Sequence, residues 1–432
     1  MRSCGSLWLL GAFVLHFAAP VCAGAAETIE ATASSSQAKF VPAGAVDGNR
    51  FSAEEGAAWK GQPDEKEWCW QVRFSQARAI GAILQVQGDH SALLRHAPRH
   101  YVWQGSLDGK TWQDWKETET TRDERMFRIH RLKEPRRVRY LRLQIRQAHG
   151  AYPTLREVEF HDRVDARISF PDWVVAVNHV TDKEVLPGSG QSFFRLARSC
   201  KGWEELQGQE IFLSRFDEAF VAAEPRPLAA FVTGSLPDWC QRDRKLWRGF
   251  QEVLKNRNLP LWASCGGAQA LAILEEVGVD KPWDCPKCRD ALHPKLPIYT
   301  HIGYSNDTKT PCSDYSNNIL EKGKYHVRAV AGDPVFEGLP REFEIMESHC
   351  GQVAYLPKDW CLIATKGLGG LTKNQCFRVK DRYIYGAQFH IEMEGTPKNS
   401  RRIMANFLSL ARQWGGYNPK GKSVPQPRPF AE

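Results

Sequence analysis

Three residues with the chemistry of a nucleophile, a base and a carboxylate stand at positions that could bring them together. The nucleophile is Cys265, which ends an apolar stretch, LPLWAS, and is followed at once by the helix-like run GGAQALAILEE. A nucleophile at a sharp turn between a strand and a helix projects from the carboxyl edge of a sheet, beside free backbone N–H groups. A thiol in that place is biased toward the reactive thiolate. Taken alone, the stretch is equally consistent with a buried core cysteine.

The base and the carboxylate are His390 and Glu392, which follow the apolar segment RYIYGAQF. Side chains two residues apart on a strand emerge on the same side, so the carboxylate can orient the imidazole. The imidazole can then take a proton from a thiol. A lone histidine is more often a structural residue. Its combination with Cys265 and Glu392 nevertheless predicts a cysteine–histidine–glutamate triad.

The segment that must position these residues, 173–416, alternates apolar strand-like runs with helix-like runs. WVVAVNHV at 173–180, LAAFVT at 228–233 and the stretch before Cys265 are expected to be buried strands. This alternation is typical of a doubly wound, flavodoxin-like α/β domain. Ligands of such sheets collect at the carboxyl ends of the strands, which is where Cys265 and the turn at Gly234 are expected.

The preceding segment, 28–162, has short alternating runs separated by turn signals, typical of an all-β sandwich. Examples are WCWQVRF at 68–74, IGAILQV at 80–86 and RVRYLRLQI at 137–145. We therefore predict two domains, 28–162 and 173–416, joined by a charged linker at 163–172. The Gly/Pro-rich tail, 417–432, is predicted to be flexible.

The first 25 residues predict a cleaved signal peptide, because Arg2 precedes an apolar run at 7–19 and small residues follow it. A secreted or periplasmic protein is expected, without an integral membrane segment. Some of the ten cysteines beyond the leader are expected to pair in that environment. Cys285-x-x-Cys288 is either part of a disulfide or half of a zinc site.

The formal net charge of +8 is modest for 432 residues. The basic residues of 122–146 are scattered, so a solvated surface is their simplest interpretation. No block of basic residues is interleaved with aromatic ones, which argues against a nucleic-acid partner.

The second half of the chain resembles the class I glutamine amidotransferase domain. The motifs are C-x-G-x-Q at 265–269, DPVFEGLP at 333–340, SH at 348–349 and GAQFHIE at 386–392. The resemblance implies a nucleophile at Cys265, a general base and acid at His390 and an orienting carboxylate at Glu392. The substrate would be a glutamine-type amide, cleaved through a thioester without a cofactor. The resemblance also implies oxyanion donors at Gly266, Gly234 and Ser235, and substrate contacts at Gln269, Ser348 and His349.

The sequence departs from that family's pattern at four places. Ala263 stands where the family usually has glycine, two residues before the cysteine. Ser235 stands in the oxyanion loop, Ile391 replaces the proline of His-Pro-Glu, and Gly351 replaces the acid of Ser-His-x-Asp. We expect hydrolysis of a small-molecule or peptide amide, because the chain shows no domain that would accept ammonia. A γ-glutamyl hydrolase-like peptidase stays open. So does a catalytically inactive scaffold in an extracellular carbohydrate- or surface-binding protein.

The first half resembles the coagulation-factor type C, or discoidin-like and galactose-binding-like, domain. The motifs, in order, are AVDGN, WCWQVRF, GSLDGKTW, RYLRLQI and LREVEF. The resemblance implies a jelly-roll sandwich that binds a glycan or a cell-surface ligand through loops at one end. It also implies a structural calcium ion near Asp47 and Asn49. A purely structural sandwich is the alternative.

Overall fold

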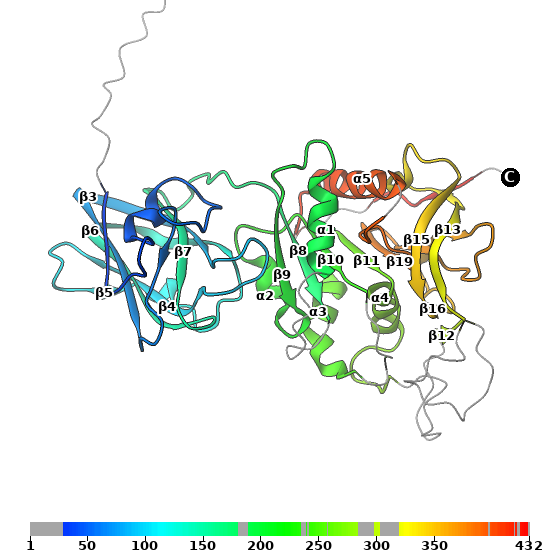
Figure 1. Cartoon of the computed structure of the whole chain (residues 1–432), viewed down its shortest axis with the longest axis horizontal. Coiled ribbons are helices and arrows are strands. Elements are labelled where there is room, and N and C mark those ends of the chain that lie inside the picture. Colours follow the sequence, from blue (N-terminus) through cyan, green and yellow to red (C-terminus); the bar gives the residue numbers. More distant parts are fainter. Residues whose placement is uncertain are drawn as a thin grey trace, which may run out of the picture.

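The computed structural model of the chain describes residues 29–179, 189–234, 239, 242–256, 258–283, 298–302, 319–395, 398–418, 420 and 424–430. These residues form an all-β domain, blue to cyan in Figure 1, and an α/β domain, green to red. Both predicted fold classes are confirmed. Within the described parts of the chain, no helix combines the length and the apolar character of a membrane span.

The all-β domain is an antiparallel sandwich whose strands follow the order β2-β7-β3-β6-β4-β5, with β1 paired to β3. Its strands are β1 (Ile29–Ala33), β2 (Trp59–Lys60), β3 (Trp68–Gln87), β4 (Pro98–Ser106), β5 (Gln113–Asp114), β6 (Phe127–Ala148) and β7 (Thr154–His161). Short 3-10 turns, η1 (Pro42–Val46) and η2 (Lys116–Thr118), lie between them. Five buried tryptophans lie in the interior: Trp59, Trp68, Trp70, Trp103 and Trp115.

Strand β3 runs through both layers of this sandwich. It pairs first with β1 and later with β7, and β6 follows it along almost its whole length. Its register against β6 shifts between Arg73 and Arg78 and again between Ile80 and Ala82. Such irregularities bend a strand while keeping it paired. The two strands predicted at 68–74 and 80–86 are therefore one bent strand.

The α/β domain is built on a nine-stranded sheet in the order β15-β13-β17-β18-β19-β11-β10-β8-β9. The part from β9 to β19 is parallel, and the part from β18 to β15 is antiparallel. The strands are β8 (Trp173–Asn178), β9 (Gln207–Phe212), β10 (Ala229–Val232), β11 (Leu261–Ser264), β13 (Glu321–Ala329), β15 (Glu342–His349), β17 (Trp360–Lys366), β18 (Cys376–Val379) and β19 (Ile384–Ala387). Smaller pairs join β12 (Tyr299–His301) to β16 (Gly351–Val353) and β14 (Ala331–Gly332) to β20 (Arg428–Pro429).

Helices cover both faces of the parallel part, as a buried parallel sheet requires. Val175 of β8 packs in one apolar cluster with α3 and α4, whereas Val174 packs in a second cluster with α1 and α5. The helices are α1 (Ser189–Arg198), α2 (Glu218–Ala222), α3 (Arg248–Asn256), α4 (Gly266–Glu276) and α5 (Lys398–Trp414), with 3-10 turns η3 (Leu213–Arg215), η5 (Arg244–Trp247) and η6 (Pro334–Phe336). The carboxyl ends of β10 and β11 therefore open at one edge of the sheet.

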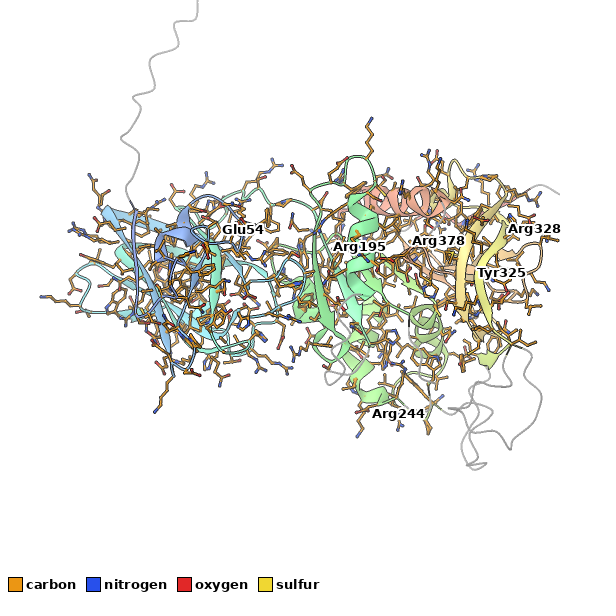
Figure 2. All side chains as sticks on the ribbon, in the orientation of Figure 1. Glu54, Arg195, Arg244, Tyr325, Arg328 and Arg378 are labelled. Atoms are coloured by element: carbon orange, nitrogen blue, oxygen red, sulfur yellow. The ribbon has the colours of Figure 1, made fainter. Side chains whose placement is uncertain are left out.

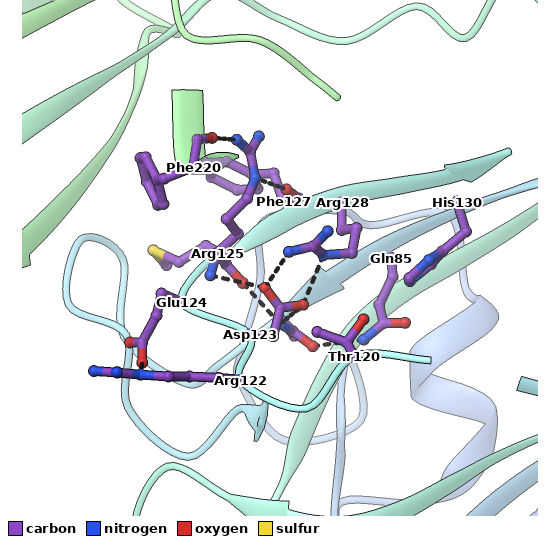
Figure 3. A network of polar contacts seen from close by, with 12 residues as sticks. Gln85, Thr120, Arg122, Asp123, Glu124, Arg125, Phe127, Arg128, His130 and Phe220 are labelled. Carbon is purple, nitrogen blue, oxygen red and sulfur yellow. Dashed lines mark hydrogen bonds and ion pairs between the residues drawn. The ribbon is translucent and has the colours of Figure 1, made fainter. Parts of the chain in front are cut away.

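Polar contacts join the two domains, as Figure 3 shows for Arg125 and Phe220, and one apolar cluster contains residues of both domains. Arg125 of the sandwich is 1% exposed and donates to the carbonyl oxygens of Phe220 and Pro225 in the α/β domain. Gln209 of β9 accepts from the Met126 amide at 3.0 Å. The basic residues of 122–146 were predicted to be solvated, and this prediction is wrong for Arg125. Exposed charges such as Glu54 and Arg328 lie elsewhere on the two domains (Figure 2).

The prediction of a flexible tail is also wrong for the described residues of 417–432. Val424 is buried, and β20 pairs with β14. The Pro425 carbonyl accepts a hydrogen bond from Arg378, a buried side chain labelled in Figure 2. These contacts could not be predicted from the composition of the tail, because one is made by a backbone carbonyl and another by a single apolar side chain.

Candidate active site

Cys265 is the residue at which β11 turns into α4. Its backbone has φ 51° and ψ −114°, a strained conformation for a residue with a side chain. The Cys265 amide donates to the Ala387 carbonyl of β19 at 2.7 Å, which holds the turn against the sheet. A Cβ on Gly267 would lie 2.9 Å from the Val232 carbonyl, so only glycine lets α4 begin this close to β10. The elbow expected from the sequence is present.

His390 lies beyond β19, with Glu392 beside it. Its Nδ1 is 2.7 Å from Glu392 Oε1. Its backbone N–H donates to the Met346 carbonyl of β15 at 2.8 Å, which fixes the ring next to the end of that strand. Among the described residues, His390 Nε2 is a buried nitrogen without a hydrogen-bond partner. The ring therefore presents one occupied nitrogen and one nitrogen available for chemistry.

The thiol and the imidazole influence each other's charge. Burial alone would raise the pKa of Cys265, but the nearby His390 and, more weakly, His349 bring it below its ordinary value. Burial alone would lower the pKa of His390, yet Glu392 and Cys265 raise it well above the usual range. Both shifts favour a thiolate–imidazolium pair, the reactive form of a cysteine nucleophile. Cys265 is 5% exposed, so this pair is shielded from bulk water.

Gly234 closes the site from the end of β10. A Cβ built on Gly234 would lie 3.0 Å from His390 Cε1 and 3.6 Å from Cys265 Cβ. The glycine backbone therefore lies directly against both side chains. Ser235, the other predicted donor of that turn, lies outside the described residues. The third, the Gly266 amide, stands at the start of α4 and stabilises the Cys265 thiolate.

Ser348 and His349 end β15 next to the thiol. The Ser348 carbonyl is 3.8 Å from Cys265 Sγ. His349 Nδ1 faces the Gly351 carbonyl at 3.0 Å, while its Nε2 lies 2.8 Å from a Glu347 carboxylate oxygen and 3.3 Å from one of Glu321. A doubly protonated ring fits this arrangement, since a carbonyl faces Nδ1 and carboxylates lie near Nε2. No acid stands at Gly351, and the two glutamates beside His349 come from other positions.

Gln269 is buried and its amide is used by the protein. Its Oε1 accepts from Trp239 Nε1 at 3.1 Å, and its Nε2 donates to the Gly351 carbonyl at 2.9 Å. The side chain therefore ties α4 to β16. Its contact with substrate stays a prediction.

Ser264 is a residue of this site that the sequence did not indicate. Its hydroxyl donates to Glu392 Oε2 at 2.9 Å. A small polar residue at the end of an apolar strand carries no recognisable signal, because its importance depends on Glu392, which is 128 positions away in the chain.

The predicted calcium ligands of the sandwich lie in a turn close to Glu157. The Asp47 carboxylate accepts from the Asn49 amide at 2.7 Å, and Asn49 Oδ1 faces the Phe51 amide at 3.4 Å. Burial, together with Asp47 and Glu159, raises the pKa of Glu157 to about 8. Asp47 and Glu157 offer part of the oxygen shell that Ca²⁺ takes. Among the described residues, however, no three His, Cys, Asp or Glu side chains are arranged for a metal. The calcium ion stays a prediction.

The remaining expectations fall partly outside the described residues. The signal peptide, Cys285 and Cys288 lie there. Five cysteines within the described ranges are free thiols: Cys69, Cys200, Cys265, Cys361 and Cys376.

Comparison with known proteins supports both resemblances. The family model of the F5/8 type C domain matches residues 30–158, and that of the class-I glutamine amidotransferase matches residues 248–410. The chain therefore carries an F5/8 type C domain followed by a class I glutamine amidotransferase domain.

Curated relatives match part of the second domain. The chain is 35% identical over 101 residues to a GMP synthase [glutamine-hydrolyzing] of Thermosipho africanus, covering 23% of this chain and 17% of that protein. It is 34% identical over 94 residues to a GMP synthase [glutamine-hydrolyzing] subunit of Thermoplasma acidophilum, covering 22% and 45%. The chain thus spans less than half the length of either relative. A crystal structure of a GMP synthase subunit from T. acidophilum matches over 57% of this chain and 98% of that one, at 18% identity and a TM-score of 0.41.

Proposed function

We propose that the chain is an amide hydrolase acting on glutamine or a γ-glutamyl-type amide. The second domain supports amidotransferase or amide hydrolase chemistry in general. In the proposal Cys265 is the nucleophile, His390 the general base and acid, and Glu392 the carboxylate that orients His390. The observation that carries the proposal is the 2.7 Å contact between His390 and Glu392 beside a strained Cys265.

The first half of the proposed reaction acylates the enzyme. Cys265 Sγ attacks the amide carbon and forms a C–S bond, while the thiol proton is held by His390. The carbonyl oxygen becomes an oxyanion that accepts from the Gly266 amide and from the turn after Gly234. His390 then gives its proton to the amide nitrogen, the C–N bond breaks, and ammonia or an amine leaves. A thioester on Cys265 remains.

The second half releases the acid. His390 takes a proton from water, and the oxygen attacks the thioester carbon. The C–S bond breaks, the product leaves as a carboxylic acid, and Cys265 returns as a thiolate beside protonated His390. Glu392 keeps the imidazole in one orientation through both proton transfers. No cofactor takes part in these steps.

We further propose that the protein is exported and that the sandwich targets it to a glycan or another surface ligand. The F5/8 type C domain supports carbohydrate binding in general terms. A screen of the full chain against immobilised glycans tests this part. Binding that is equal for every glycan, or absent for all of them, would contradict a glycan as the ligand.

The hydrolase is tested by ammonia and glutamate release from glutamine and from γ-glutamyl peptides. Replacing Cys265 by Ala removes the bond-forming atom, so turnover should fall by about 10³-fold or more. A glutamine-mimicking electrophile should label Cys265 of the unmodified protein and leave Cys265→Ala unlabelled. Cys376→Ala is the control, because Cys376 is a buried thiol of the same domain that lies on β18.

The alternative is a scaffold that binds but does not hydrolyse, and the burial of Cys265 is the observation that favours it. Equal, trace ammonia release by the unmodified protein and by Cys265→Ala, with no labelling of Cys265, would establish the scaffold and end the hydrolase proposal.

A further inference from the structure

We infer that Ser264 is a positioning residue of this site, which acts on His390 through Glu392. This inference rests on the proposed function, because it gives Ser264 a part in the same chemistry. Ser264 Oγ donates to Glu392 Oε2 at 2.9 Å, while Glu392 Oε1 faces His390 Nδ1 at 2.7 Å. The two oxygens of one carboxylate thus connect the serine hydroxyl to the imidazole.

The direction of these hydrogen bonds follows from Trp262. Its Nε1 lies 3.2 Å from Ser264 Oγ, and an indole N–H can only donate. Ser264 therefore accepts from Trp262, and its single proton is left for Glu392. A carboxylate that accepts at both oxygens is in its ionised form, and hydrogen bonds to such a group are stronger than neutral ones.

The donors are anchored in the protein core. Trp262 and Ser264 are two apart on β11, so their side chains share a face of the sheet, and both are 0% exposed. The indole packs against Tyr385 of β19 and Phe407 of α5, with ring centroids 5.8 Å and 6.0 Å away. Ser264 is fully buried, so the donor to Glu392 Oε2 is a group of the protein core.

This arrangement stabilises the charged form of the nucleophile. When Ser264 binds Oε2 of Glu392, Oε1 of the same carboxylate remains in contact with His390 Nδ1. His390 Nε2 is then available to the thiol. Without the hydroxyl, the carboxylate loses a donor that favours its ionised form. The thiolate–imidazolium pair should then be lost at a higher pH than in the unmodified protein.

The other titratable group facing the thiol is His349, held by Glu347 and Glu321. Burial alone would lower its pKa, but the two carboxylates raise it to about 10. His349 therefore remains charged through the acidic range in which the effect of Ser264 is measured.

The experiment measures thiol reactivity in the full chain, without any substrate. The rate of alkylation of Cys265 by iodoacetamide is followed between about pH 4 and pH 9, by mass spectrometry of the peptide that contains it. In Ser264→Ala the acidic limb should move up by about one pH unit, so that the rate measured on that limb falls by up to about tenfold, as expected for losing one hydrogen bond to a charged group. Trp262→Phe keeps an aromatic side chain but removes the indole N–H that donates to Ser264. This variant should move the acidic limb in the same direction, by a smaller amount.

A matched control is Ser400→Ala, which removes another fully buried serine hydroxyl, on α5. It should keep the unmodified profile, and thermal unfolding of each variant shows that the fold is retained. A folded Ser264→Ala with the unmodified profile overturns the inference. Should Ser264→Ala not fold, Trp262→Phe decides, since an unmodified profile in that variant overturns the inference as well.

Failure of the proposed function would look different. A shifted profile in Ser264→Ala, combined with no ammonia release by the unmodified protein, keeps the role of Ser264 and removes the amide hydrolase. Ammonia release that depends on Cys265, combined with an unshifted profile, keeps the hydrolase and removes Ser264 from the site.

Discussion

At the scale of single residues, the buried cluster of His349, Glu321 and Glu347 stands out beside the thiol. Each of the three is almost fully buried, and one imidazole lies between two carboxylates. Burial would raise the pKa of Glu321, but hydrogen bonds from His349, Thr372 and Leu371 lower it to about 2. A buried charge of this kind persists only when it is paired, and here the charge of His349 is paired with that of Glu321, while burial raises the pKa of Glu347.

This charge predicts a pH dependence of stability. The folded pKa of His349 is about 10, above its ordinary value of 6.5. Its contribution to stability is therefore complete below pH 6.5, declines as the pH rises from there, and is lost above pH 10. The difference in unfolding free energy between the unmodified protein and His349→Gln should shrink over that interval, by at most about 1.4 kcal/mol per pH unit. Urea unfolding of both proteins at several pH values measures this difference in free energy. A difference that does not change with pH would show that His349 is not charged.

The sequence indicated the residues proposed for the chemistry better than the residues that hold them in place. Cys265, His390 and Glu392 were recognisable because a nucleophile at an elbow and a spaced His–Glu pair have a local signature. Ser264 and Glu321 were not recognisable, because the role of each depends on a partner that is distant in the chain. A serine at a strand end and a glutamate at a strand start are ordinary residues until the fold brings their partners to them.

At the scale of elements, the parallel strands could be predicted from hydrophobic runs and the elbow from a glycine pair. The course of irregular strands could not be predicted in this way. β3 was predicted as two strands, at 68–74 and 80–86, and the structure keeps it continuous through register shifts. Bulges of this kind depend on the partner strand, which local sequence does not describe. The ordered tail was missed for the same reason.

The tail gives a prediction about stability. A chain ending at 423 lacks the buried Val424 and the Pro425 carbonyl that accepts from Arg378. Arg378 then keeps its pair with Asp333, at 2.9 Å, but loses one acceptor, so unfolding free energy should fall by about 1–3 kcal/mol. The melting temperature of the chain ending at 423 is compared with that of a chain ending at 430, which keeps every described tail contact. Equal melting temperatures would show that the tail does not contribute to stability.

At the scale of the whole molecule, the sandwich and the α/β domain are joined through groups that ordinarily face water. Ile129 donates its amide to the Glu224 carbonyl at 2.9 Å, and the Glu210 amide donates to the Ala92 carbonyl at 2.7 Å. Gln209 donates to the Glu124 carbonyl at 2.6 Å. Interfaces between domains are commonly polar, and their position cannot be read from sequence when the residues resemble a solvated surface. β9 and the end of α2 are thus parts of the α/β domain that contact the sandwich.

Arg125 is a buried charged residue of this junction. Its guanidinium lies 5.0 Å from the Trp173 ring and 5.2 Å from the Phe220 ring, and burial lowers its pKa to about 9. Arg125→Met keeps the apolar stem but leaves the carbonyls of Phe220 and Pro225 without this donor. The unfolding free energy should fall by about 3 kcal/mol or more, since buried acceptors would lose their partner.

The matched control is Arg122→Met, three residues earlier, where a 55% exposed arginine pairs with Glu124 at 3.0 Å. An exposed pair contributes only about 0–1 kcal/mol, so this variant should unfold like the unmodified protein. Calorimetry of the full chain should show one cooperative transition in the unmodified protein and in Arg122→Met. Arg125→Met should melt at a lower temperature, with the two domains unfolding in separate steps. If both variants behave alike, Arg125 does not couple the domains, and the sandwich is an independently folded module attached to the enzyme-like domain.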